Sequence, residues 1–161
     1  MTDLVLDVGA LAEMLAQIFA CPERDSIHFH SDTEKKFITD RVAALMNRVV
    51  HSHGQFVMVA SALAFVELAN KWEEIVNTRF HPRQLAAFLS DPPDWFAVAA
   101  IDRELIPYLC AVPAKVILPN GKVTPVEWTD AIHAATAYSR SQARLVTTDS
   151  KLRQIPNLVV Y

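Results

Sequence analysis

Glycine and cysteine are scarce in this chain of 161 residues, and their scarcity excludes several kinds of site. The sequence holds only three glycines, Gly9, Gly54 and Gly121. They form no GxGxxG or GxxxxGKS/T segment, so the glycine-rich loops that hold nucleotide phosphates are excluded. The two cysteines, Cys21 and Cys110, are too few for a disulfide framework. We therefore expect a protein of the reducing cytoplasm.

Long apolar runs and an excess of positive charge are also lacking. The most apolar stretch, residues 56–69, is interrupted by Glu67 and stays short of the roughly 18 residues that a membrane-spanning helix needs. The first residues do not have the pattern of a secretory signal. The net charge of −3 argues against a large basic surface, although residues 115–161 hold six basic and three acidic side chains. We therefore expect no membrane association, and any polyanion to bind near residues 115–161.

The sequence does have enough apolar material for one core. Apolar residues make up 52% of the chain and charged residues 20%, which is typical of a folded domain. A chain of this size buries roughly 70% of its extended surface on folding. We predict a single domain over residues 1–161, with an insertion around residues 21–53 that begins in a polar stretch without periodicity.

Strand-like and helix-like segments alternate along the chain. Short apolar runs predict strands at residues 4–6, 56–60, 95–101, 145–148 and 158–161. Helical periodicity and end signals predict helices at residues 10–19, 37–51, 62–75, 81–89, 103–112 and 125–141. The clearest helix start is a capping box from Thr124 to Glu127, with Pro125 at the first helical position. The alternation predicts an α/β fold with a mostly parallel sheet that helices cover on both faces.

Four acidic residues occupy positions where a carboxylate can serve chemistry. Asp7 and Asp149 each follow a predicted strand, at the edge where parallel sheets bind ligands. Glu67 lies among apolar residues of a predicted helix, where its charge is costly to bury without a cation. Asp130 lies near the start of another helix, whose dipole favours an anion. Clustered carboxylates are typical ligands of Mg²⁺ or Mn²⁺ bound with substrate phosphate.

Each of these acids also has a purely structural interpretation. Asp7 and Asp149 suit turns or caps, and Glu67 suits an ion pair with Lys71 one helical turn later. Asp130 complements the helix dipole whether or not it binds a ligand. The histidine pairs at residues 28–30 and 51–53 lack the second ligand pair of known zinc spacings. The tryptophans are expected in the core or an interface: Trp72, Trp95 and Trp128.

The four acids and their surroundings resemble the PIN-domain ribonucleases, a family that includes the toxins of VapC-like toxin–antitoxin pairs. Residues 6–11 (LDVGAL) look like the opening strand motif, and residues 66–67 (VE) look like the second acidic motif. Residues 130–137 (DAIHAATA) and residues 145–149 (LVTTD) are similar to the third and fourth motifs. The resemblance implies a three-layer α/β/α sandwich with a parallel sheet of about five strands.

The resemblance also implies an activity, a cofactor and partners. The catalytic residues and metal ligands would be Asp7, Glu67, Asp130 and Asp149, holding one or two Mg²⁺ or Mn²⁺ ions. The metal would activate a water molecule and neutralise charge on the scissile phosphate of an RNA substrate. For a toxin, the partner implied is an antitoxin protein. We also expect a homodimer.

Three further residues are predicted to contact the substrate. Thr148 matches a hydroxyl residue that the family often has at this place, and it would hydrogen-bond a metal-bound water or the phosphate. Lys151 and Arg153 follow Asp149 closely, so their positive charges would guide the phosphate backbone.

Two features depart from the family's pattern. The family often has serine, threonine or asparagine where this chain has Gly9, so one polar contact near the metal is missing. The segment between the first two acids, about 60 residues, is longer than in compact toxins, and it suits a clamp, a dimer contact or an antitoxin-blocking element. A degenerate PIN domain that binds RNA or protein without cutting is therefore the alternative function. An aspartyl-phosphate enzyme is disfavoured, because such enzymes usually need an aspartate where Gly9 stands.

Overall fold

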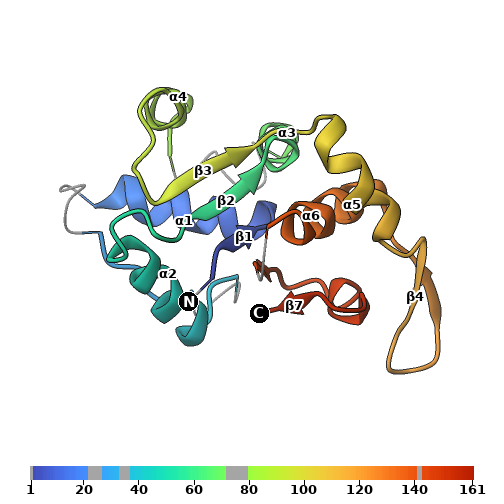
Figure 1. The fold of residues 1–161 in the computed structure, drawn as a ribbon. Helices are drawn as coiled ribbons and strands as arrows, with labels where there is room; N and C mark the ends of the chain where they lie inside the picture. Colours follow the sequence, from blue (N-terminus) through green and yellow to red (C-terminus); the bar gives the residue numbers. More distant parts are fainter. Residues whose placement is uncertain (1, 22–26, 33–36, 72–79, 141–142) are drawn as a thin grey trace.

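A sheet of five parallel strands forms the centre of the molecule (Figure 1). The computed structural model describes residues 2–21, 27–32, 37–71, 80–140 and 143–161. The strands are β1 (Leu4–Leu6), β2 (Met58–Ser61), β3 (Phe96–Ala99), β6 (Arg144–Val146) and β7 (Val159–Val160). Their order is β3-β2-β1-β6-β7, and every neighbouring pair is parallel. The predicted α/β fold with a parallel sheet is confirmed.

Helices cover both faces of this sheet, as in a three-layer sandwich (Figure 1). The helices of the first face are α1 (Val8–Ala20), α2 (Asp40–Val50) and α4 (Pro82–Ser90). The second face is covered by α6 (Trp128–Tyr138), and α5 (Ile106–Ala111) packs beside α6 after a short 3-10 turn (Arg103–Leu105). Helix α3 (Ala62–Asn70) packs against α1, and its Leu63 joins a small cluster with Ile132 of α6. Helix α3 therefore lies between the two helical layers.

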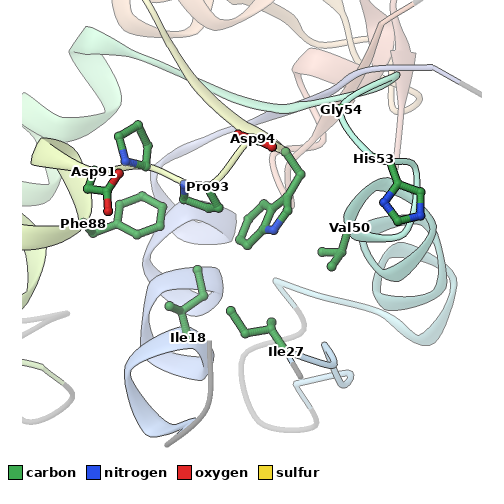
Figure 2. Close-up of a pocket in the computed structure, with 11 residues that line it drawn as sticks. Ile18, Ile27, Val50, His53, Gly54, Phe88, Asp91, Pro93 and Asp94 are labelled. Atoms are coloured by element: carbon green, nitrogen blue, oxygen red, sulfur yellow. The ribbon is translucent and has the colours of Figure 1, made fainter. Parts of the chain in front are cut away.

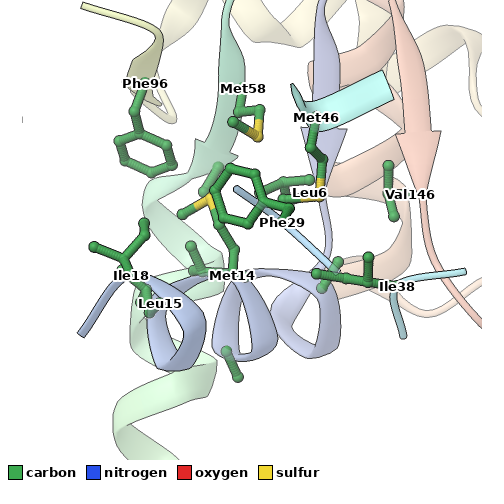
Figure 3. Packing of buried hydrophobic residues seen from close by; sticks show 14 of the residues in the cluster. Leu6, Met14, Leu15, Ile18, Phe29, Ile38, Met46, Met58, Phe96 and Val146 are labelled. Carbon is green, nitrogen blue, oxygen red and sulfur yellow. The ribbon is translucent and has the colours of Figure 1, made fainter. Parts of the chain in front are cut away.

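The two faces of the sheet have separate cores because side chains alternate along each strand. Leu6 and Val146 point to the first face, where they pack with Met14 of α1 and Met46 of α2 (Figure 3). Val5 lies between two residues of the first-face core and belongs to the cluster under α6. A strand that is buried on both faces is apolar throughout, as all three residues of β1 are.

The segment predicted as an insertion contributes to the core of the first face. Its fully buried side chains include Phe29, Ile38 and Met46. The helix expected at residues 37–51 is present as α2, and Thr39 caps its start by accepting a hydrogen bond from the Val42 amide at 3.3 Å. The described part of this segment is thus built into the domain.

The predicted helix start at Thr124 is wrong. Residues Val123–Pro125 form strand β5, which pairs antiparallel with β4 (Lys115–Ile117) in a separate hairpin (Figure 1). The Val126 amide continues the pairing by donating to the Ala114 carbonyl at 3.0 Å. Because residues 123–126 are held in this extended pairing, α6 begins three residues after Pro125, at Trp128. Pro125 fits an edge strand because it has no amide hydrogen to donate.

Other element ends differ by a few residues. Strand β6 ends at Val146 and not at Thr148, so Asp149 lies in the following loop. Strand β3 is shorter than residues 95–101, and α6 ends at Tyr138. The expected continuation of α3 to residue 75 lies largely outside the described residues, since 72–79 are not among them. None of the described helices has the length and apolar character that crossing a membrane requires.

Candidate active site at the carboxyl edge of the sheet

The four predicted acids are arranged around the carboxyl ends of the central strands. Asp7 directly follows β1, and Asp149 lies in the loop after β6. Glu67 lies in α3, the helix that follows β2, and Asp130 is in the first turn of α6. The strand order reverses between β1 and β6, and ligands in open parallel sheets bind at such a reversal.

Asp7 is held in place by the helix that it caps. Its Oδ1 atom accepts a hydrogen bond from the Ala10 amide at 2.8 Å, which fixes the carboxylate at the start of α1. Burial raises the pKa of Asp7, while hydrogen bonds from the Ala10 amide and the Thr147 side chain and the charge of His133 lower it. Because the burial effect is the largest, the ionised carboxylate would be stabilised by an added cation.

Asp130 and Asp149 share one cationic partner. The Lys151 ammonium nitrogen lies 2.9 Å from Asp130 Oδ2 and 3.4 Å from Asp149 Oδ2. A third carboxylate, the exposed Glu127, lies 3.7 Å from the same nitrogen. The hydrogen bond with Asp130, followed by the charges of Asp130 and Asp149, raises the pKa of Lys151, so this side chain stays protonated.

Glu67 is paired with a buried histidine. His133 Nε2 lies 2.9 Å from Glu67 Oε2, and His133 Nδ1 lies 3.4 Å from Ser61 Oγ. His133 is 3% exposed and Ser61 is 1% exposed, so neither can meet a substrate directly. Ser61 also caps α3 by accepting from the Ala64 amide at 3.2 Å. His133, with Ser61 behind it, therefore orients Glu67. The three residues do not form a serine-nucleophile site, which needs an accessible hydroxyl.

Hydrogen bonds and ion pairs link Asp7, Asp149 and Asp130, and Glu67 is linked to them only through the charge of His133. Thr147 hydrogen-bonds Asp7, and its Oγ1 atom accepts from the Asp149 amide at 3.1 Å. Asp149 and Asp130 meet at Lys151. On the other side, His133 contacts Glu67 and acts on Asp7 through its charge. The network thus brings together acidic residues from four separate parts of the chain.

The donor atoms of this network are of the kind that a hard divalent cation prefers, although their arrangement here holds an ammonium group. Carboxylate oxygens are the usual ligands of Mg²⁺ and Mn²⁺, and here those of Asp130 and Asp149 already converge on one cation. Within the described ranges, no three histidine, cysteine, aspartate or glutamate side chains are arranged to hold a metal ion. The Lys151 ammonium group lies between the carboxylates in this structure, at a position that suits a cation.

The three residues predicted to contact substrate are placed differently from one another. Thr148 and Arg153 are exposed, whereas Thr147, the neighbour of Thr148, is buried and hydrogen-bonds within the acidic network. Lys151 lies in the network, where it pairs with carboxylates. Sequence reasoning missed Thr147 and His133. His133 could have been found from its spacing, because it follows Asp130 by three residues in the same helix, and this spacing places both side chains on one helix face.

The tryptophans are split between core and surface. Trp95 is 9% exposed, as expected for a core residue. Trp128 is 67% exposed at the first position of α6, next to Glu127, so a core position is wrong there and a position in an interface stays a prediction. Trp72 lies outside the described residues.

A hollow of about 470 Å³ lies at the opposite edge of the sheet. Ile18, Ile27 and Val50 point toward it, and Asp94 lies on its rim just before β3 begins (Figure 2). It is lined mainly by apolar and proline side chains and lies away from the carboxyl ends of the strands. The hollow therefore has no part in the acidic network.

Comparisons of this chain with protein-family models, curated proteins and solved structures find no match. We therefore infer the function from the residues of the site itself.

Proposed function

We propose that this chain is a metal-dependent endoribonuclease that hydrolyses RNA phosphodiester bonds with Mg²⁺ or Mn²⁺. The observation that carries the proposal is the network that joins Asp7, Glu67, Asp130 and Asp149 at the carboxyl edge of a parallel sheet. Concentrated carboxylates attract divalent cations, and phosphate esters are the substrates that such cations polarise. The four acidic motifs that resemble PIN-domain ribonucleases support the same proposal.

Each residue of the network has a distinct part in this proposal. Asp130 and Asp149 would hold the metal, because they already converge on one cation. Asp7 would add a half-buried negative charge at the same edge of the sheet, and the contact with His133 would hold Glu67 in one orientation. When bound, the metal supplies the activated water and neutralises charge on the phosphate. The protein need not supply a side-chain nucleophile.

A cleavage assay with matched acid variants tests this function. A 5′-labelled single-stranded RNA is incubated with the wild-type protein and with Mg²⁺, Mn²⁺ or EDTA. We expect cleavage only with the metals, and a loss of at least about 100-fold in rate for Asp130→Asn and Asp149→Asn, since each removes a metal ligand. The control Asp94→Asn changes an exposed acid at the opposite edge of the sheet and should cleave like the wild type. Intact RNA in all metal conditions would overturn the proposal.

The alternative of a degenerate PIN domain is favoured by one observation. Lys151 already neutralises part of the charge of Asp130 and Asp149, so these acids are paired without a metal. A protein of this kind would bind RNA with similar affinity in EDTA and in Mn²⁺ and would leave it intact. Filter binding run beside the cleavage assay separates the two functions.

The role of a toxin with an antitoxin partner is the narrower form of the proposal. It is supported by the resemblance of the motifs alone. Such a toxin would act in the cytoplasm, and its expression should arrest growth, whereas Asp130→Asn should not. A homodimer also remains a prediction, and sedimentation of the purified protein tests it.

A further inference from the structure

One lysine is the cationic centre of the acidic network. The Lys151 ammonium nitrogen lies within 3.7 Å of the carboxylates of Asp130, Asp149 and Glu127. Its backbone is fixed as well, because the Lys151 amide donates to Asp149 Oδ1 at 2.7 Å. The side chain is only 20% exposed, although lysine side chains usually extend into water. Lys151 is therefore bound at both its backbone and its charged end.

The two oxygen atoms that hold this ammonium group belong to the proposed metal ligands. The nearer contact, to Asp130, is as short as a charge-assisted hydrogen bond. A divalent cation on the same carboxylates would lie about 2.0–2.2 Å from its oxygen ligands. It would therefore stand close to the ammonium group, and the two like charges would repel each other in a partly buried place. One position between the carboxylates cannot hold both cations.

We propose that Lys151 is an internal counterion that occupies the metal position and must leave it when a divalent cation binds. This inference rests on the proposed function. Without metal, the lysine holds Asp130 and Asp149 together and limits their mutual repulsion. When the metal enters, the flexible side chain releases its ammonium group at the rim of the site, where it can contact a phosphate oxygen. The affinity of the site for metal is thus set by competition with the protein's own lysine.

Metal-binding calorimetry on matched variants tests the competition without using activity. Mn²⁺ is titrated into metal-free wild type, Lys151→Met and Arg153→Met. Lys151→Met removes the competing charge with a side chain of similar length, and we expect it to bind Mn²⁺ at least about tenfold more tightly. Arg153→Met removes one positive charge from an exposed residue of the same loop, so it should change the affinity less than about threefold.

A second measurement uses the wild type alone and does not depend on the folding of a variant. Lysines are labelled briefly with acetic anhydride, with and without Mn²⁺, and the modified sites are quantified by mass spectrometry. We expect Mn²⁺ to increase labelling of Lys151 several-fold and to leave Lys122, on the separate hairpin loop, unchanged. Labelling of Lys151 should rise because Mn²⁺ releases its ammonium group from the carboxylates and exposes it to the reagent.

The outcomes separate this inference from the proposed function. Equal Mn²⁺ affinity in wild type and Lys151→Met, with unchanged Lys151 labelling, overturns the counterion role and leaves the nuclease proposal standing. Failure of Mn²⁺ to bind either protein overturns the metal-dependent function, and the inference with it. Tighter binding in Lys151→Met but not in Arg153→Met supports the inference whether or not the assayed RNA is cleaved.

Discussion

A Cβ atom added at Gly9 would lie 2.6 Å from Cε1 and 2.7 Å from Cδ1 of Phe37. Phe37 comes from the long segment between the first two acids, and its ring packs over the start of the helix that Asp7 caps. Gly9 and the long segment, the two features that differ from the pattern of PIN-domain ribonucleases, therefore contact each other. A hydroxyl residue does not fit at position 9 while this ring is in place.

We predict that Gly9→Ser, which introduces the kind of residue that PIN-domain ribonucleases often have at the matching place, destabilises this protein. The new side chain must displace the Phe37 ring, and overpacking of this kind costs about 1–3 kcal/mol. Urea unfolding measures the change. The same substitution is also made in a Phe37→Ala variant, which has no ring at this place. There Gly9→Ser should lower the free energy of unfolding much less. Equal costs in both backgrounds, a coupling energy near zero, would contradict the contact.

The contact between Gly9 and Phe37 also illustrates what the sequence can and cannot predict. The strand before Asp7, the parallel sheet and the place of Asp149 after another strand could be predicted, since each follows from local periodicity and from the topology of alternating elements. A shared site with Asp130 was expected only from the resemblance of the motifs. The Phe37 contact could not, because it joins residues 28 positions apart through packing and leaves no periodic signal.

Local signals also failed where pairing with another segment competed with them. The sequence around Thr124 has the composition of a helix start, yet its backbone pairs with Lys115–Ile117 in a hairpin. In the same way, the spacing of Lys151 after Asp149 indicated a phosphate contact. The sequence alone did not indicate that Asp130 from another helix would approach the same ammonium group.

Asp7→Asn should make the metal-free protein more stable at neutral pH. Asparagine caps a helix about as well as aspartate, so the bond to the Ala10 amide can be kept. Burial raises the pKa of Asp7, so the folded protein holds this proton more tightly than the unfolded chain. The free energy of unfolding contributed by this group therefore falls as pH rises from the ordinary pKa, near 4, to the raised pKa of the folded protein. Above the raised pKa the whole contribution is lost.

The pH dependence of unfolding provides the measurement for Asp7. Across the acidic range just described, Asp7→Asn should lose less stability with rising pH than the wild type does. Asp94→Asn, which changes an exposed acid, is the matched control and should follow the wild-type curve. If the curves of Asp7→Asn and the wild type were parallel, the Asp7 carboxyl would have the same pKa in the folded and unfolded chains, against the prediction.

His133→Ala should lower both stability and metal affinity. Its loss removes the 2.9 Å partner of the half-buried Glu67 and the 3.4 Å neighbour of the buried Ser61, and loss of a hydrogen bond to a charged group costs about 1.5–3 kcal/mol. His133→Gln keeps a hydrogen-bond donor for Glu67 and should recover part of the Mn²⁺ affinity. If His133→Ala lost stability but bound Mn²⁺ like the wild type, the histidine would serve packing and not the orientation of Glu67.

Trp128→Leu should weaken the binding of single-stranded RNA. The Trp128 side chain is 67% exposed and follows Glu127, which contacts Lys151, so an RNA strand bound at the acidic network would pass near the indole. Stacking of a base on an aromatic ring contributes about 1–3 kcal/mol, so we expect the Kd to rise by about 5- to 150-fold. Fluorescence polarisation measures it in an Asp149→Asn background, where the RNA stays intact.

A conservative variant separates stacking from a general loss of surface contact. Trp128→Phe keeps an aromatic face and should bind RNA more tightly than Trp128→Leu does. Ile117→Ala is the matched control, because it shortens an equally exposed apolar side chain, 66% accessible, on the hairpin. If bases stack on residue 128, Trp128→Phe should retain RNA affinity that Trp128→Leu loses. If the contact is a nonspecific apolar one, both variants should have the same Kd. Equal affinities of those two variants would therefore remove Trp128 from the RNA path, even if metal-dependent cleavage were intact.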